Sequence, residues 1–125
     1  MPSRAKQRVL LVDDEEDLVA ATAFRLQSAG YEPLLEPNGQ LGLQTAIDAR
    51  PDLVLLDVMM PGLDGFEVLR ALRTREETQR MPVIMLTAKS MMRDIEQAFL
   101  YGADDYITKP YEWNRLQIKI RRLLP

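Results

Sequence analysis

Apolar residues in this chain fall into short runs that are separated by longer amphipathic segments. Three of the short runs, Val9–Val12, Leu53–Leu56 and Val83–Leu86, are uniformly apolar, as expected for strands buried on both faces, whereas Tyr31–Leu35 is a weaker strand signal. The longer segments carry apolar residues at helical spacing and are bounded by Gly, Pro or a capping residue. The pattern predicts strands over Val9–Val12, Tyr31–Leu35, Leu53–Leu56, Val83–Leu86 and Asp105–Thr108, and helices over Asp17–Ser28, Gln40–Ala49, Phe66–Arg73, Ser90–Tyr101 and Glu112–Leu124.

Five strand–helix pairs indicate an α/β fold. Parallel strands need crossover connections of about this length, so we expect a parallel sheet with helices on both faces. The chain shows no internal repeat, low-complexity stretch or linker. We therefore expect a single domain over residues 1–125, with no output domain.

Composition narrows the chemistry that the chain can perform. Cysteine and histidine are both absent, which excludes disulfides, thiolate metal sites, imidazole acid–base catalysis and His-ligated zinc. Any reaction that the chain performs must therefore use carboxylates, hydroxyls, amines and a hard metal ion.

The net charge of −3 combines two unequal regions. Asp13–Asp17 is a run of five consecutive acids, whereas Lys109–Pro125 contains five Lys and Arg residues and one acid, Glu112. An acidic total disfavours direct nucleic-acid binding. No apolar run approaches the ~20 residues that span a bilayer, and the first run is too short for a signal peptide. We expect a cytoplasmic protein that does not bind membranes.

Polar residues follow four of the five predicted strands. They are Asp13 and Asp14 after the first strand, Asp57 after the third, Thr87 after the fourth and Lys109 after the fifth. Ligands of open parallel sheets bind at the carboxyl ends of the strands, so we expect these side chains to converge. We interpret Glu15, Glu16 and Asp17 instead as acids that complement the dipole of the following helix.

Four stretches, LLVDDEE, LVLLDVMMPGLDGFE, VIMLTA and GADDYITKP, resemble the receiver domains of response regulators in bacterial two-component signalling. The resemblance extends over the whole chain. It implies a flavodoxin-like, doubly wound (βα)5 fold with a five-stranded sheet of order 2-1-3-4-5, as in chemotaxis regulators. It also implies a phosphorylation-activated switch, whose only chemistry is phosphotransfer to itself and autodephosphorylation, rather than an enzyme.

The same resemblance assigns roles to the strand-end acids. Asp57 matches the phosphoryl acceptor of the family, and a carboxylate can form an aspartyl phosphate. Asp13, Asp14 and Asp57 would hold Mg²⁺, or Mn²⁺ as an alternative, with the backbone carbonyl of Met59 as a further ligand. A divalent cation would relieve the repulsion between converging carboxylates.

Further residues match the family's phosphoryl-binding and switch positions. Thr87, Ala88 and Lys109 would bind the phosphoryl group, and the peptide bond before Pro110 is expected to be cis. Thr87 would move inward on phosphorylation and Tyr106 would follow, which alters the face formed by the last two helices and the strand between them. We expect this output face to include Met91, Met92, Ile95, Tyr106, Tyr111, Trp113, Arg115, Lys119 and Arg122.

The resemblance also implies partners. A sensor histidine kinase or a histidine phosphotransfer protein would donate the phosphoryl group, so the missing histidine belongs to the partner. GADDYITKP further resembles receivers of winged-helix transcription factors, which dimerise through the output face. A second copy of the chain is therefore another candidate partner.

Two other functions compete with the switch. A Mg²⁺-dependent phosphatase of the haloacid-dehalogenase kind needs a second Asp two residues after the nucleophile, where this chain has Met59. A receiver-like adaptor would bind its partner without phosphorylation. Such degenerate receivers lack part of the set of acids, threonine and lysine, all of which are present here.

Overall fold

The computed structural model describes residues 5–88 and 92–125 of the chain. The predicted strand–helix alternation is confirmed. In chain order the elements are β1 (Arg8–Val12), α1 (Glu16–Ser28), β2 (Glu32–Glu36), α2 (Gly39–Ala49), β3 (Leu53–Asp57), α3 (Gly65–Thr74), β4 (Val83–Ala88), α4 (Met92–Leu100), β5 (Asp105–Lys109) and α5 (Trp113–Leu123).

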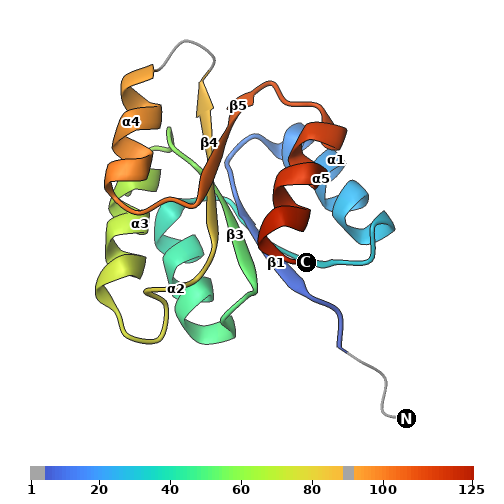
Figure 1. The fold of residues 1–125 in the computed structure, drawn as a ribbon, viewed down its shortest axis with the longest axis horizontal. Helices are drawn as coiled ribbons and strands as arrows, with labels where there is room; N and C mark the ends of the chain where they lie inside the picture. Colours follow the sequence, from blue (N-terminus) through green and yellow to red (C-terminus); the bar gives the residue numbers. More distant parts are fainter. Residues whose placement is uncertain (1–4, 89–91) are drawn as a thin grey trace.

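The five strands form one parallel sheet in the order β2-β1-β3-β4-β5. This confirms the doubly wound arrangement. Helices α1 and α5 cover one face of the sheet, and α2, α3 and α4 cover the other (Figure 1). None of the helices within residues 5–88 and 92–125 is long and apolar enough to cross a membrane.

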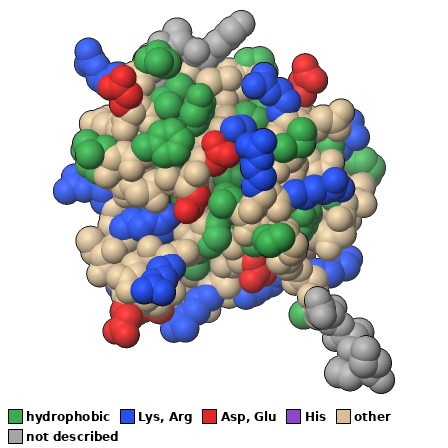
Figure 2. Space-filling view, in the orientation of Figure 1, with side chains coloured by type: hydrophobic (Ala, Val, Ile, Leu, Met, Phe, Trp, Pro, Cys, Tyr) green, Lys and Arg blue, Asp and Glu red, His purple; other side chains and the backbone are tan. Residues whose placement is uncertain are grey.

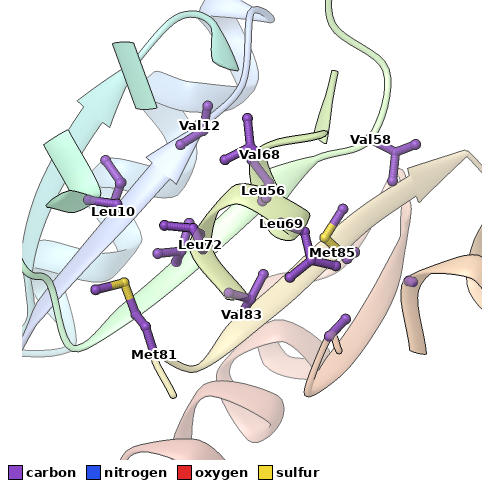
Figure 3. Packing of buried hydrophobic residues seen from close by; sticks show 14 of the residues in the cluster. Leu10, Val12, Leu56, Val58, Val68, Leu69, Leu72, Met81, Val83 and Met85 are labelled. Atoms are coloured by element: carbon purple, nitrogen blue, oxygen red, sulfur yellow. The ribbon is translucent and has the colours of Figure 1, made fainter. Parts of the chain in front are cut away.

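The uniformly apolar strands contribute side chains to two separate cores, because successive side chains of a strand point to opposite faces of the sheet. In β1, Leu10 and Val12 join the cluster under α2, α3 and α4, whereas Val9 and Leu11 join the cluster under α1 and α5. Figure 3 shows the first cluster, where strand residues such as Leu56 pack against α3. A strand with two buried faces has no polar alternation, which explains its sequence pattern.

Four strands extend further at their carboxyl ends than predicted. β2 includes Glu36, β3 includes Asp57, β4 includes Thr87 and Ala88, and β5 includes Lys109. The backbone ladder continues through these residues, and because most of them are polar, an apolar pattern cannot mark the extension. The predicted helix start at Ser90 lies outside the described residues.

The turn after β3 brings α3 close to the end of that strand. Gly65 N–H donates to the Val58 carbonyl over 3.0 Å. A Cβ on Gly65 would lie 2.2 Å from the Asp57 carbonyl oxygen, so only glycine allows this approach. Asp64 and Glu67 close a capping box at the same helix start. Asp57 is thereby held on a tightly packed turn.

At the opposite end of the sheet, Arg73 of α3 bonds to the segments that precede β4 and β5. Its guanidinium donates to the carbonyls of Gly102 (2.9 Å) and Met81 (2.8 Å) and pairs with Asp104 (3.1 Å). Asp104 in turn accepts from the Val83 N–H over 2.8 Å. Arg73 therefore links α3 to the segments that precede β4 and β5.

Arg73→Met should destabilise the domain, because it leaves two carbonyls and a carboxylate without their charged donor. We expect the free energy of unfolding to fall by about 2–3 kcal/mol in urea denaturation. Arg75→Met is the matched control, because the Arg75–Glu77 pair lies at the surface and should contribute less than about 1 kcal/mol. Equal losses for both variants would contradict this role of Arg73.

Candidate functional site

Three acids converge at the carboxyl ends of β1 and β3. Asp13, Asp14 and Asp57 each place a carboxylate oxygen within 4.8 Å of the others. Asp13 and Asp57 are buried, while Asp14 is exposed. Hard divalent cations prefer such oxygen ligands, and three like charges at this separation favour a cation between them. The donor set therefore fits Mg²⁺ or Mn²⁺.

Lys109, the last residue of β5, brings an ammonium group to the acids. Its Nζ lies 3.0 Å from Asp13 Oδ2 and 3.4 Å from Asp57 Oδ2. A third carboxylate, Glu15 Oε1, lies 2.5 Å away. Burial lowers the pKa of Lys109, but the bonds to Glu15 and Asp13 and the charge of Asp57 raise it well above its ordinary value. The Lys109–Pro110 peptide bond is cis.

The surroundings of Asp57 oppose its ionisation. Burial, followed by the charge of Asp13, raises the pKa of Asp57 to about 6. The charge of Lys109 and the Met59 N–H, which donates to Asp57 Oδ1 over 3.3 Å, act in the opposite direction. Lys109 alone does not neutralise the carboxylates around it.

A cavity of about 180 Å³ opens beside Asp57. Glu15, Asp57, Met59, Ala88 and Lys109 line it. A larger cavity of about 630 Å³ lies between the β3–α3 turn and α4, but it shares only Met59 with the smaller one and contains none of the converging acids. The smaller cavity is therefore the one that adjoins both Asp57 and Lys109.

Thr87 directly precedes Ala88, which lines this cavity, and Thr87 itself is fully buried. Within the described part of the chain, its hydroxyl oxygen has no hydrogen-bond partner. Buried hydroxyls are normally paired, and an unpaired one is unfavourable. The Thr87 hydroxyl therefore has an unused hydrogen-bonding capacity, and it can reach a ligand in the cavity only if the side chain moves.

Tyr106 lies on β5 on the same side of the sheet as Thr87. Met85 is opposite Tyr106 across the β4–β5 ladder, and Thr87 follows Met85 by two residues. The Tyr106 ring meets Phe99 edge-on at 5.8 Å and has Lys119 Nζ 5.3 Å from its centroid. The two side chains assigned to the switch therefore share one face.

The residues of the predicted output face differ in exposure and do not all lie on one part of the molecule. Met92, Arg115 and Arg122 are exposed, Ile95 is half-buried, and Lys119 is paired with Asp105 over 3.0 Å. Figure 2 shows hydrophobic side chains among Lys and Arg side chains over α4, β5 and α5. Met91 lies outside the described residues.

Tyr111 and Trp113 belong to a different part of the molecule from Tyr106. Both pack against the cluster under α1 and α5, whereas Tyr106 packs against the cluster on the opposite face. The Tyr111 hydroxyl is 2.9 Å from the Thr22 hydroxyl of α1, and burial raises the pKa of Tyr111. These two aromatic residues therefore border the α1–α5 seam.

The interpretation of the acidic run missed the contact of Glu15 with Lys109. Glu15 is the N-cap of α1, but its side chain makes no capping hydrogen bond. Its carboxylate reaches across to β5 instead. Spacing along α1 contains no information about the distance to β5, so the sequence offered no direct signal of this pair.

Residues 9–121 match the family model described as the response regulator receiver domain. The phosphate regulon transcriptional regulatory protein PhoB of Pseudomonas aeruginosa is 42% identical over 116 residues, which are 93% of this chain and 51% of that protein. The chain thus spans about half the length of the curated relatives it matches.

Solved structures of the same fold are similar over nearly the whole chain. Chemotaxis protein CheY4 of Vibrio cholerae has a TM-score of 0.89 and 31% identity, covering 95% of this chain and 99% of that one. The receiver domain of sensor histidine kinase PA1611 from Pseudomonas aeruginosa has a TM-score of 0.88 and 33% identity, covering 96% and 98%. The latter structure holds a magnesium ion in its active-site cleft.

The raised pKa of Asp57 predicts a pH-dependent effect of Asp57→Asn on stability. Unfolded Asp57 loses its proton near pH 4 and native Asp57 near pH 6, so the native state binds the extra proton between these values. The contribution of Asp57 to stability is thus present below about pH 4 and is lost as the pH rises through about 6.

We therefore expect Asp57→Asn to match the wild type near pH 4 and to be about 2 kcal/mol more stable at pH 8. Urea denaturation in the presence of a chelator measures this difference. A variant that is less stable than the wild type at pH 8 would show that pairing with Lys109 outweighs burial.

Proposed function

The chain belongs to the response regulator receiver domain family, and we propose that it is a switch activated by phosphorylation of Asp57. Family membership agrees with the four sequence stretches that resemble receivers. The observation that carries the proposal is the convergence of Asp57 with Asp13, Asp14 and Lys109 beside a small cavity. A buried nucleophilic carboxylate, a set of cation ligands and a nearby positive charge are what phosphoryl acceptance needs.

Receiver domains accept phosphoryl groups from histidine kinases, so the proposed donor is a phosphohistidine, which lies outside these 125 residues because they contain no histidine. An Asp57 carboxylate oxygen attacks phosphorus, the new P–O bond forms as the P–N bond breaks, and the imidazole leaves. With its pKa at about 6, Asp57 is mostly ionised at neutral pH and ready to attack. A sensor histidine kinase or a histidine phosphotransfer protein of the cytoplasm supplies this donor.

Asp13, Asp14 and Asp57, with the Met59 carbonyl, are the groups that would hold Mg²⁺ or Mn²⁺. When bound, such a cation would neutralise negative charge at these carboxylates and stabilise the charge of a transferring phosphoryl group. The acidic cluster supports this assignment, as does the magnesium ion in the related PA1611 receiver. Asp13 and Asp57 also hold Lys109 at the site.

Lys109, Thr87 and Ala88 would receive the phosphoryl group once it is on Asp57. Lys109 exchanges its carboxylate partners for phosphoryl oxygens, which a compact ammonium does readily. Thr87 donates its unpaired hydroxyl to another oxygen, and the Ala88 N–H donates as well. The movement of Thr87 frees space on the face that it shares with Tyr106.

A shift of Tyr106 changes the surface of α4, β5 and α5, because its ring contacts Phe99 of α4 and Lys119 of α5. The two arrangements are populations that phosphorylation rebalances. Curated relatives of about twice this length are transcriptional regulators. We therefore propose that this surface controls an output domain, a second copy of the chain or another partner.

Incubation with acetyl phosphate and Mg²⁺ should add one phosphoryl group, a mass increase of about 80 Da expected for an aspartyl phosphate. Intact-mass spectrometry should show the adduct in the wild type and in Asp64→Asn, a control that retains the helix cap. Asp57→Asn should remain unlabelled. A wild type that takes up neither phosphoryl nor beryllofluoride would contradict the switch and favour an adaptor.

Thr87→Val should weaken phosphoryl binding without lowering the stability of the domain. Removal of the unpaired hydroxyl should leave the stability unchanged or raise it by about 1 kcal/mol, and should weaken beryllofluoride binding by about tenfold. Trp113 fluorescence measures the binding. Thr78→Val is the control, because the buried Thr78 hydroxyl donates to the Leu72 carbonyl over 2.7 Å and its loss should destabilise the domain. Unchanged beryllofluoride affinity in Thr87→Val would exclude the hydroxyl from phosphoryl binding.

A further inference from the structure

Lys109 is shared unequally among its three carboxylate partners. Its Nζ is 2.5 Å from Glu15, 3.0 Å from Asp13 and 3.4 Å from Asp57. The acid that is to be phosphorylated is thus the most distant of the three. We propose that Glu15 is a positioning residue that retains Lys109 in the unphosphorylated state and thereby slows phosphoryl acceptance. This inference rests on the proposed function of Asp57.

The local backbone directs Glu15 toward this contact. The Glu15 N–H donates to Asp13 Oδ1 over 3.0 Å, which fixes its main chain against the metal-binding acids. Its side chain is not used to cap α1. The carboxylate is therefore free to extend across the site, where it meets Lys109 on β5.

Glu15 also contributes charge where the phosphoryl donor must pass. It lines the 180 Å³ cavity together with Asp57 and Lys109, and its side chain is 59% exposed. A phosphorylated donor is anionic, so a carboxylate at the mouth of the cavity repels it. When the phosphoryl group has arrived, Lys109 must leave Glu15 to contact it. Both effects act against phosphorylation.

Exposure limits the size of the effect. Ion pairs with one exposed partner contribute modestly, and the measured range for exposed pairs corresponds to a rate change of about two- to fivefold. Glu15 therefore modulates the rate of phosphorylation and is not required for it. Salt should weaken its influence, because screening is effective at exposed sites.

The test compares Glu15→Gln with Glu16→Gln and the wild type. Glu16 is the next residue, is exposed, and shows no ion pair with Lys109 within the described structure. Both variants lose one negative charge at the start of α1, so they differ in the contact with Lys109 and not in net charge. Phosphorylation by acetyl phosphate at saturating Mg²⁺ is followed by intact mass and by fluorescence of Trp113, the single tryptophan of the chain.

We expect Glu15→Gln to be phosphorylated about two- to fivefold faster than the wild type at low salt, and Glu16→Gln to match the wild type. The ratio between Glu15→Gln and the wild type should approach one as salt is raised, whereas a purely structural effect would not depend on salt. Urea denaturation of each variant verifies that all are folded.

Two results would overturn the inference while leaving the switch intact. One is a Glu15→Gln rate equal to that of the wild type or of Glu16→Gln. The other is a slower rate, which would mean that Glu15 prepares Lys109 for the phosphoryl group or helps to hold the cation. If the wild type itself takes up no phosphoryl group, the proposed function fails instead.

Discussion

Among the residues that the structure describes, the carboxyl edge of the sheet concentrates more negative charge than the Lys109 ammonium can balance. Asp13, Asp57 and Glu15 all contact Lys109, and Asp14 stands beside them. Burial of Asp57 strengthens the repulsion, because little water remains to screen it. The excess charge is therefore unfavourable on its own, and the three acids form a donor set that fits a divalent cation.

The rest of the fold serves to hold these charges together. Asp13 and Asp57 stand at or just after the ends of strands whose preceding residues are buried, so their positions are tied to a close-packed core. Lys109 ends β5, in which Ile107 is buried and the other residues are half-buried. The glycine turn after β3 and the two-faced packing of β1 leave little freedom for the site to relax by moving apart. The stability of both cores offsets the unfavourable electrostatics at the edge, a common arrangement at functional sites.

The sequence predicts the parts of this structure that depend on local pattern. Buried strands follow from apolar runs, and the meeting of Asp13 with Asp57 follows from the rule that the ends of parallel strands share an edge. The contact between Glu15 and Lys109 does not follow, because it depends on side-chain reach between α1 and β5. The same holds for Tyr111, which the resemblance places on the output face and which bonds to α1. Local pattern specifies elements and their ends, whereas contacts between distant elements depend on how the helices pack.

Lys109 connects the chemistry of the site to its electrostatics. An ammonium that is held by several carboxylates can change partners without leaving the site, so each partner affects how readily it turns to another. Asp13 would also bind the cation, and Asp57 would carry the phosphoryl group, so neither can vary without loss of function. Glu15 lies at the exposed edge and has no such second role in the described structure. In the proposed switch, the charge of Glu15 therefore adjusts the rate of phosphorylation while the buried acids preserve the chemistry.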